Sequence, residues 1–337
     1  MRLQGALLGA GNIALRGHAP QWSGDESLLR EAEIVAVADL SEENLEQVGR
    51  VFPAARRYRE AEELIERETL DFADVCTPPF TRRALIGQIA ARGIHLVCEK
   101  PLALALDEAQ HIARAVRRAK VVFHPCHQYH HSPQWRTLRA QLPRLGRIYL
   151  AEYEVHRTRA DQGNPHWRPG WRTERRLSGG GILVDHGAHI FYQLRAVLGE
   201  PSRVQATVRT LSHRDYGVED TALVVLDHGD CLAQVRLNWA ARRREIRFRF
   251  VGEKGEIVGN ERGLRIEVRG RAREVAFPAG MSRDSSHSEW YRPLLRAFSR
   301  RVRTAECGTE TLDEAVYVTR LITRAYESSD QGRARPL

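Results

Sequence analysis

The chain has 337 residues, which is long enough for two domains that each bury a substantial core. It contains no run of about 18 apolar residues, which excludes a membrane-spanning helix, and its five scattered cysteines predict neither a disulfide framework nor a zinc ribbon. The net charge of +9 invites a nucleic-acid-binding interpretation, but all except three of the 52 basic residues are arginine, without an interleaved aromatic platform. We therefore expect a cytoplasmic protein that binds neither membranes nor nucleic acids.

The first predicted element is a β-strand over residues 3–8, which runs into the turn Gly9-x-Gly11-x-x-Ala14. In a strand-turn-helix unit the first glycine makes the tight turn, the second admits a pyrophosphate, and the small third residue lets helix pack on strand. The following helix N-terminus offers unpaired N–H groups to the phosphates. The residues predicted to bind a dinucleotide here are Gly9, Gly11, Asn12 and Ile13.

A second buried strand is predicted over residues 33–38, and it ends at Asp39. A carboxylate at this position would accept hydrogen bonds from the ribose of the adenosine half and repel a 2′-phosphate, which favours NAD and leaves NADP open. The gap from the glycines exceeds the usual roughly 20 residues, and an inserted loop around residues 22–25 would account for the excess. The alternative for Asp39 is a solvated carboxylate at a strand end.

The next segments alternate between helix and strand, and are predicted at residues 41–51, 61–67, 72–76, 81–92 and 94–98. Two of the strands run into proline-containing motifs, Thr77-Pro78-Pro79 and Glu99-Lys100-Pro101. Ligands of doubly wound sheets lie at the carboxyl ends of the strands, so Thr77, Pro78, Glu99 and Lys100 are predicted beside the cofactor. A partly desolvated Lys100 ammonium could polarise a substrate oxygen. The alternative is a strand-end lysine in water.

A histidine-rich segment at residues 124–131 follows a predicted helix at 106–118 and a short strand at 121–123. Its four histidines and one cysteine raise a metal hypothesis. We set that hypothesis aside because the adjacent His130 and His131 cannot both face one ion in regular structure, and no acidic partner is near in the sequence. No metal site is predicted.

The second half of the chain is predicted to begin with a helix at 133–141, a strand at 148–156 and an irregular loop at 163–171. Three glycines, 179–181, precede an amphipathic helix that ends before Gly199. Asp185 and His189 are four residues apart on it, and they would project together as a proton-transfer pair or half of a metal site. The alternative is a helix whose polar face holds the two by chance.

Short alternating runs between residues 203 and 277 predict a mostly antiparallel sheet. The runs lie at residues 204–211, 221–226, 232–239, 246–251, 257–259 and 264–268. Two helices, at about 288–303 and 312–328, are expected to close the chain.

Four motifs in this order resemble those of the glucose-fructose oxidoreductase, inositol dehydrogenase and MocA (Gfo/Idh/MocA) oxidoreductases. The motifs are Gly9-x-Gly11-x-x-Ala14, Thr77-Pro78-Pro79, Glu99-Lys100-Pro101 and Gly179-Gly180-Gly181 followed by Asp185-x-Gly187-x-His189. The resemblance implies an α/β fold with an N-terminal NAD(P)-binding Rossmann domain at residues 1–125. A substrate-binding and oligomerisation domain at 126–337 would carry a large, mostly antiparallel open sheet and the catalytic helix, about 181–198. A cis bond before Pro101 is also implied.

The resemblance also implies roles for single residues. Lys100, Asp185 and His189 would occupy the catalytic positions, and Asp185 and His189 would also contact substrate. Further substrate contacts are expected at the domain junction and in the 163–171 loop: His127, Tyr129, Trp167, Arg168 and Arg172, with Trp171 nearby. A stacked tryptophan with arginines would suit a sugar ring bearing a negative group. Family members commonly form homodimers or homotetramers through the C-terminal sheet.

The expected activity is NAD(P)-dependent hydride transfer to or from a secondary hydroxyl or ketone of a sugar, inositol or related polyol. His189 would act as general base, Lys100 would stabilise charge on the oxygen, and Asp185 would either orient His189 or bind an adjacent hydroxyl. Two residues depart from the family pattern: Tyr192 stands where relatives often carry an aspartate, and Arg82 where they often carry a histidine. These departures argue against assigning the substrate of any one relative to this chain. The alternatives are NAD-dependent glycoside hydrolysis and a non-catalytic, dinucleotide-bound binding protein.

Overall fold

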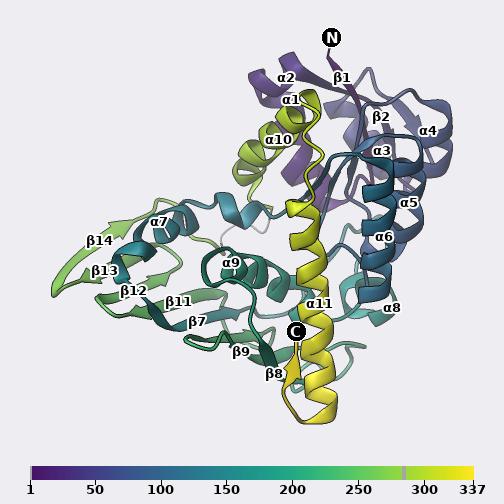
Figure 1. Ribbon diagram of the computed structural model, residues 1–337. Coiled ribbons are helices and arrows are strands. Elements are labelled where there is room, and N and C mark those ends of the chain that lie inside the picture. Colours follow the sequence, from purple (N-terminus) through teal and green to yellow (C-terminus); the bar gives the residue numbers. More distant parts are fainter. Residues whose placement is uncertain (1, 283–285) are drawn as a thin grey trace.

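Two β-sheets form the framework of the computed structural model, which describes residues 2–282 and 286–337 (Figure 1). The first sheet is parallel and six-stranded, in the order β3-β2-β1-β4-β5-β6. Its strands are β1 (Leu3–Leu8), β2 (Ala32–Ala38), β3 (Arg56–Tyr58), β4 (Phe72–Val75), β5 (His95–Cys98) and β6 (Phe123–Pro125). The order reverses between β1 and β4, and in sheets of this kind ligands bind at that point.

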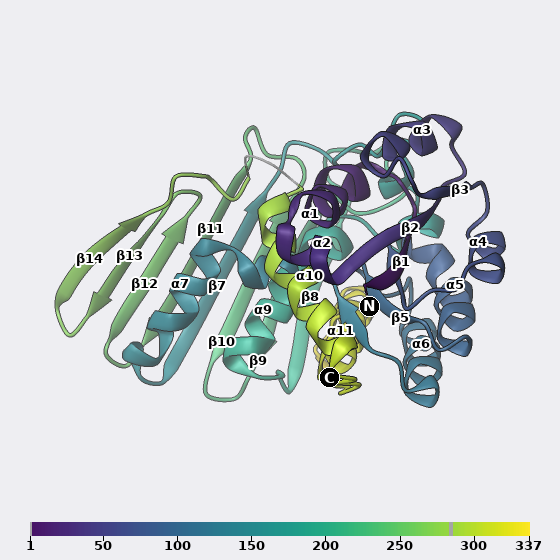
Figure 2. The ribbon, with the colours of Figure 1, turned by 90° about the horizontal axis from the view of Figure 1, so that it is seen from above.

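Helices cover both faces of this sheet (Figure 2). They are η1 (Ala14–His18), α1 (Ala19–Gly24), α2 (Glu26–Glu31), α3 (Glu42–Val51), α4 (Ala61–Arg67), α5 (Pro79–Ala91) and α6 (Leu106–Ala119). The loop expected at 22–25 was a wrong prediction, because α1 and α2 occupy this segment. Asp25 accepts hydrogen bonds from the backbone N–H groups of Ser27 and Leu28 and so begins α2, while Trp22 and Leu28 are buried.

The second sheet has nine strands in the order β14-β13-β12-β11-β7-β10-β9-β8-β15. The strands are β7 (Ile148–His156), β8 (Arg203–Arg209), β9 (Thr221–Asp227), β10 (Leu232–Asn238), β11 (Glu245–Gly252), β12 (Gly255–Asn260), β13 (Gly263–Val268), β14 (Arg271–Ala276) and β15 (Arg335–Pro336). All pairs are antiparallel except β7 with β10. The edge strands β14 and β15 were not predicted, since β14 is almost entirely exposed and lacks alternating apolar residues.

One face of this sheet is covered by α7 (Pro133–Gln141) and α9 (Ala188–Leu198) (Figures 1 and 2). The short helices of this half are η2 (Gln128–His131), η3 (Leu142–Leu145), η4 (Trp171–Thr173), α8 (Arg175–Ser178) and η5 (Leu183–Gly187). The covered face carries large apolar side chains such as Tyr153, Phe248 and Phe250. The strands therefore alternate between buried and exposed residues, which explains the alternating sequence pattern.

The chain returns to the first sheet at its end. Helix α10 (Ser288–Arg303) buries Leu294, Leu295 and Phe298 against residues of β1 and β4, including Leu7 and Phe72. The long helix α11 (Glu310–Gln331) runs beside α6 and reaches β8 (Figure 1). The expected α/β fold with a parallel and a mostly antiparallel sheet is confirmed. None of the helices within the described residues is long and apolar enough to cross a membrane.

Candidate active site

A cavity of about 490 Å³ lies where the carboxyl ends of the first sheet meet η5 and α9. Its lining includes the glycine turn at Gly9 and Gly11 at one end and Asp185 and His189 at the other, with Lys100 contributed by the loop after β5. The glycine turn of the first half of the chain and the Asp185–His189 motif of the second half therefore line the same cavity.

The glycine turn has the shape that a dinucleotide phosphate needs. Gly9 has a φ of +88°, and a Cβ there would lie 3.0 Å from the backbone nitrogen of Thr77, so a side chain would be strained and crowded. A Cβ on Gly11 would meet nothing within 4 Å, which leaves open space beside the backbone. These residues fit a bound pyrophosphate, as the sequence motif predicted.

Asp39 closes this end of the cavity. Its Oδ2 accepts a hydrogen bond from the Ala10 N–H at 2.6 Å, and its Oδ1 accepts from the Ser41 N–H at 2.8 Å and from Asn44 Nδ2 at 3.1 Å. The carboxylate therefore ties the end of β2 to the glycine turn. Arg59 donates to the carbonyl of Leu40, the residue after Asp39, and Arg16 lines the same cavity.

Arg82 joins the two proline-containing loops beside the cavity. Its Nε and Nη2 donate to the Thr77 carbonyl at 3.1 and 2.6 Å, and its Nη1 donates to the Pro101 carbonyl. The Lys100–Pro101 bond is cis, as the resemblance implied. Arg82, flagged in the sequence as a departure, thus holds the loops that carry Thr77 and Lys100 together.

Lys100 and Asp185 form an ion pair across the two halves of the chain. Lys100 Nζ donates to Asp185 Oδ1 at 3.1 Å and to the Asp185 carbonyl at 2.9 Å. Burial alone would raise the pKa of Asp185, but the charge of Lys100, with His186 and Arg172, outweighs it and holds the pKa far below its usual range. Asp185 is therefore a carboxylate that fixes the ammonium at the cavity wall.

The expected pairing of Asp185 with His189 takes a different form. Residues 183–187 form a π-helical turn, and no hydrogen bond joins the two side chains among the described residues. A π-helical turn closes i→i+5 hydrogen bonds in place of the i→i+4 bonds of an α-helix. Asp185 faces Lys100 instead.

His189 is oriented by two tyrosines. Its Nδ1 lies 2.9 Å from the hydroxyl oxygen of Tyr192, which also accepts a hydrogen bond from the Tyr129 N–H at 3.2 Å. The ring stacks on Tyr129 with centroids 4.2 Å apart. Burial, followed by the charge of Lys100, holds the pKa of His189 well below 6.5. The imidazole is thus neutral at pH 7, and Nε2 is the ring nitrogen left for a ligand.

The glycine triplet has a packing role. A Cβ on Gly180 would lie 1.9 Å from the Tyr326 hydroxyl, and one on Gly181 would lie 1.9 Å from the Glu219 carbonyl oxygen. The Glu219 side chain accepts from the Leu183 N–H at 3.0 Å and from the Tyr326 hydroxyl at 2.8 Å. The triplet lets the helix that carries Asp185 start against these groups, which is the close approach that the sequence indicated.

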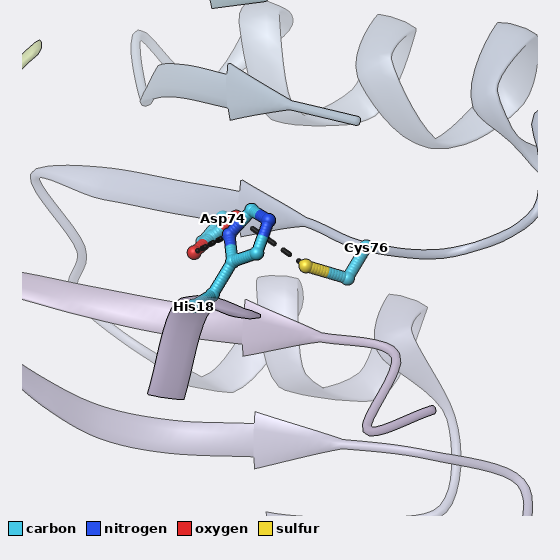
Figure 3. A group of neighbouring side chains, drawn as sticks. All are labelled: His18, Asp74 and Cys76. Atoms are coloured by element: carbon cyan, nitrogen blue, oxygen red, sulfur yellow. Dashed lines mark hydrogen bonds and ion pairs between the residues drawn. The ribbon is translucent and has the colours of Figure 1, made fainter. Parts of the chain in front are cut away.

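A buried charged cluster lies beneath the Glu99 end of the cavity. His18 Nδ1 is 2.8 Å from Asp74 Oδ2, and His18 Nε2 is 3.1 Å from Glu99 Oε1. Figure 3 shows the His18 side chain, from η1, beside Asp74 of β4. Cys76 lies next to both, and its Sγ is 3.5 Å from Asp74 Oδ1. Burial lowers the pKa of His18, but the charge of Asp74 and its hydrogen bond outweigh it, so the pKa is raised well above 6.5. His18 is therefore an imidazolium between two carboxylates.

Replacing His18 by glutamine is expected to destabilise the fold by about 3–5 kcal/mol, because two buried carboxylates lose their cation. Since the folded-state pKa is raised, this stabilisation is fully present below pH 6.5 and disappears as pH rises through the folded-state pKa. Urea denaturation at pH 6 and pH 9 checks this. The free energy of unfolding of His18→Gln should lie closer to that of wild type at pH 9 than at pH 6. His111 is exposed, so His111→Gln should have the wild-type free energy of unfolding at both pH values.

Three groups of side chains in the described structure have ligand atoms within 4.8 Å of one another: His18-Asp74-Cys76, His18-Glu99-Cys126 and His127-His130-Glu314. Burial raises the pKa of both thiols, Cys76 and Cys126, which opposes the thiolate that a metal requires. In the third group Glu314, from α11, accepts from His127 and lies 3.4 Å from His130 Nε2. Each group is accounted for by hydrogen bonding, and the absence of a metal site stays a prediction.

Most of the predicted site residues line the cavity: Gly9, Gly11, Asn12, Ile13, Asp39, Thr77, Pro78, Glu99, Lys100, Tyr129, Trp167, Arg172, Asp185 and His189. His127 and Arg168 are outside the described cavity lining. His127 instead stacks on Tyr192 at 4.0 Å, behind His189. Trp167 stacks on Phe80 at 6.4 Å, and so its loop reaches the first half of the chain.

Arg157, Arg244 and His186 also line the cavity, and sequence reasoning missed them. No signal marked the two arginines, because arginine is so abundant throughout the chain. Their placement next to the ends of adjacent strands, β7 and β11, becomes visible only once the register of those strands is known.

Two family models match this chain. One, described as an oxidoreductase family with an NAD-binding Rossmann fold, matches residues 3–127, and the other, described as the GFO/IDH/MocA C-terminal domain, matches residues 135–258. The chain belongs to the Gfo/Idh/MocA family of NAD-binding oxidoreductases. The family resemblance that the four sequence motifs carried is thereby confirmed.

Similar proteins within the Gfo/Idh/MocA family include sugar dehydrogenases. D-apiose dehydrogenase from Paraburkholderia graminis is 29% identical over 275 residues, which is 79% of this chain and 68% of that protein. The rhizopine catabolism protein MocA from Rhizobium meliloti is 30% identical over 235 residues, 68% of each chain. A solved oxidoreductase from Agrobacterium radiobacter, in complex with NAD+, L-tartaric acid and magnesium, has a TM-score of 0.86 at 22% identity and covers 100% of this chain and 98% of its own. That likeness shows the shared fold.

Proposed function

We propose that this protein transfers a hydride between NAD and a secondary hydroxyl or ketone of a sugar or related polyol. The observation that carries the proposal is the meeting of the Lys100–Asp185 pair and His189 in one cavity whose other end is the glycine turn. The names of its relatives support the substrate class, since D-apiose dehydrogenase and 1,5-anhydro-D-fructose reductase act on sugars.

In the oxidising direction NAD, when bound, would supply the hydride acceptor, and this chain's residues handle the proton and the charge. Lys100 Nζ, held by Asp185, donates to the substrate oxygen and stabilises the negative charge that grows on it. His189 takes the hydroxyl proton at Nε2, with Nδ1–H donated to the Tyr192 oxygen. In the reducing direction Nε2–H returns the proton.

Asp185 acts on the substrate through Lys100 in this proposal. Of the two roles left open for it, orientation of His189 is taken over by Tyr192, to which His189 is hydrogen-bonded. Asp185 also lines the cavity and keeps lone pairs for an adjacent substrate hydroxyl.

We propose NAD as the preferred cofactor because the Asp39 carboxylate lies beside the glycine turn, where it would accept hydrogen bonds from the adenosine ribose and repel a 2′-phosphate. NADP remains the second choice, since Arg59 lies beside Asp39 and could face a 2′-phosphate. We also propose a cytoplasmic location, because the dinucleotide that the protein would use is abundant inside cells. Cell fractionation would test this location.

The experiment is a fluorescence titration of the purified protein with NADH and NADPH, followed by assays of polyols and sugars for reduction of added NAD+. We expect tighter binding of NADH and substrate-dependent formation of NADH. A protein that binds neither dinucleotide, or that never reduces NAD+ with any polyol or sugar, would contradict the proposal.

We also propose a homodimer or homotetramer formed through the uncovered face of the second sheet. This face carries the exposed side chains of Leu223 and Val225 on β9 and Leu232 on β10, with exposed fractions of 46%, 38% and 48%. Burial of such a patch stabilises association.

Light scattering should give a mass of two or four 38.3 kDa chains. Leu223→Arg should lower the measured mass toward that of a single chain. A wild-type protein that stays monomeric at high concentration would overturn this proposal.

A further inference from the structure

Three arginines that line the substrate end of the cavity form what we call the arginine cluster: Arg157, Arg172 and Arg244. Arg157 directly follows β7, and Arg244 directly precedes the adjacent strand β11. Arg172 lies in η4, and its Nη1 donates to the Asp161 carbonyl at 3.4 Å. Guanidinium groups from three separate elements thus meet at one end of the cavity.

The carboxylates at this end do not balance the cations. Asp185 pairs with Lys100, and Asp161 Oδ1 pairs with Arg244 Nη1 at 2.7 Å. Among the described residues, neither Arg157 nor Arg172 forms an ion pair. The substrate end therefore carries two positive charges without a carboxylate partner.

Arg157 is the more informative of these two. Its side chain is almost entirely buried, with 1% of the residue exposed. Nη1 donates to the carbonyls of His156 at 2.9 Å and Glu245 at 3.4 Å, whereas Nε has no hydrogen-bond partner in the described structure. Leaving a buried cation without a counter-charge costs free energy, and Arg157 lacks the carboxylate partner that Arg244 has, so an anionic ligand would stabilise it.

The free edge of Arg157 also indicates the shape of that partner. Nε and Nη2 lie side by side on the guanidinium edge away from the two carbonyl contacts of Nη1. Two parallel N–H donors on one edge match the two oxygens of a carboxylate. Arg172, stacked over the Trp171 ring at 4.5 Å, supplies a second cation at the same end.

We propose that the substrate is a sugar acid whose carboxylate is bound by Arg157 and Arg172, with Arg244 held beside them by Asp161. This inference rests on the proposed oxidoreductase function and specifies the substrate of that site. Lys100 and His189 would act on a hydroxyl of the same molecule while the arginine cluster holds its anionic end. The arginines thereby fix which hydroxyl faces the cofactor.

The test uses the full-length protein loaded with NADH and titrated calorimetrically with D-glucuronate, D-galacturonate, D-gluconate, D-glucose and D-glucose 6-phosphate. At least one sugar acid should bind tenfold or more tightly than D-glucose, because hydrogen bonds to charged groups contribute about 1.5–3 kcal/mol. Arg157→Gln and Arg172→Gln should each lower the affinity for the sugar acid about tenfold and lower the affinity for D-glucose much less.

Arg159→Gln is the matched control, since Arg159 is exposed, two residues after Arg157 and outside the described cavity lining. Arg157 is buried, so Arg157→Gln can fail to fold. In that case the affinity of Arg172→Gln for the sugar acid tests the proposal, because Arg172 is partly exposed. The carboxylate proposal is overturned if no acid binds better than D-glucose, if the preference survives Arg172→Gln, or if D-glucose 6-phosphate binds most tightly. Binding of NADH without sugar is measured separately. A protein that binds NADH and oxidises neutral polyols without preferring acids would contradict this inference alone.

Discussion

Replacing Lys100 by alanine should lower kcat by about a thousandfold, the upper end of what removing one charge-stabilising donor costs an enzyme. The ammonium is the cation that Asp185 holds at the cavity wall, with Nζ 3.1 Å from Asp185 Oδ1. Without it, charge on the substrate oxygen would develop beside an uncompensated carboxylate. Steady-state kinetics on a substrate found in the screen measures the effect.

Two further variants sharpen the Lys100 result. Lys100→Arg keeps the charge but moves the donors, so it should recover only part of the lost turnover. Lys254→Ala removes an exposed lysine from the turn between β11 and β12 and should keep wild-type kinetics. NADH binding should persist in Lys100→Ala, which would separate a chemical defect from misfolding. Turnover of Lys100→Ala close to that of wild type would rule out the assigned role.

Replacing His189 by asparagine should lower kcat by about a hundredfold to a thousandfold, within the usual range for loss of a general base. Asparagine can still hydrogen-bond to Tyr192 but cannot take a proton at neutral pH. Because burial and the charge of Lys100 lower the pKa of His189 well below 6.5, the base is already neutral at pH 7.

The pH profile distinguishes a base from a residue that only packs. Oxidation requires neutral His189, so activity should rise with pH through the lowered pKa and reach its plateau below pH 6.5. His189→Asn should lose this acidic limb. Tyr192→Phe removes the hydrogen bond to Nδ1 and keeps the imidazole, so it should retain the limb with a smaller fall in kcat. A His189→Asn profile that keeps the acidic limb would exclude His189 as the titrating base.

The parallel sheet and its ligand edge were predictable because strand ends, glycines and prolines are local signals. Gly9, Thr77 and Lys100 each follow a buried strand, and parallel strands bring their carboxyl ends to one edge. The convergence of Lys100 with Asp185 came from the family resemblance, since no local pattern links positions 85 residues apart.

Other parts of the site depend on tertiary structure that the sequence does not display. Asp185 is hydrogen-bonded to Lys100 and His189 to Tyr192, although the helical spacing of Asp185 and His189 predicted that these two would pair. His18 and Glu99 meet only because η1 packs over the end of β4 and β5. Arg157 and Arg244 were indistinguishable from the chain's many surface arginines until the pairing of β7 and β11 brought them to the cavity.

The central claim is that an ammonium from the first half and an imidazole from the second flank the nicotinamide of a bound dinucleotide. A crystal structure of the protein grown with NAD+ tests it most directly. The account predicts the phosphates against Gly9 and Gly11, and the nicotinamide ring beside Thr77 with its reactive face toward Lys100 and His189. A dinucleotide bound elsewhere, or a nicotinamide that protein side chains separate from Lys100 and His189, would contradict it.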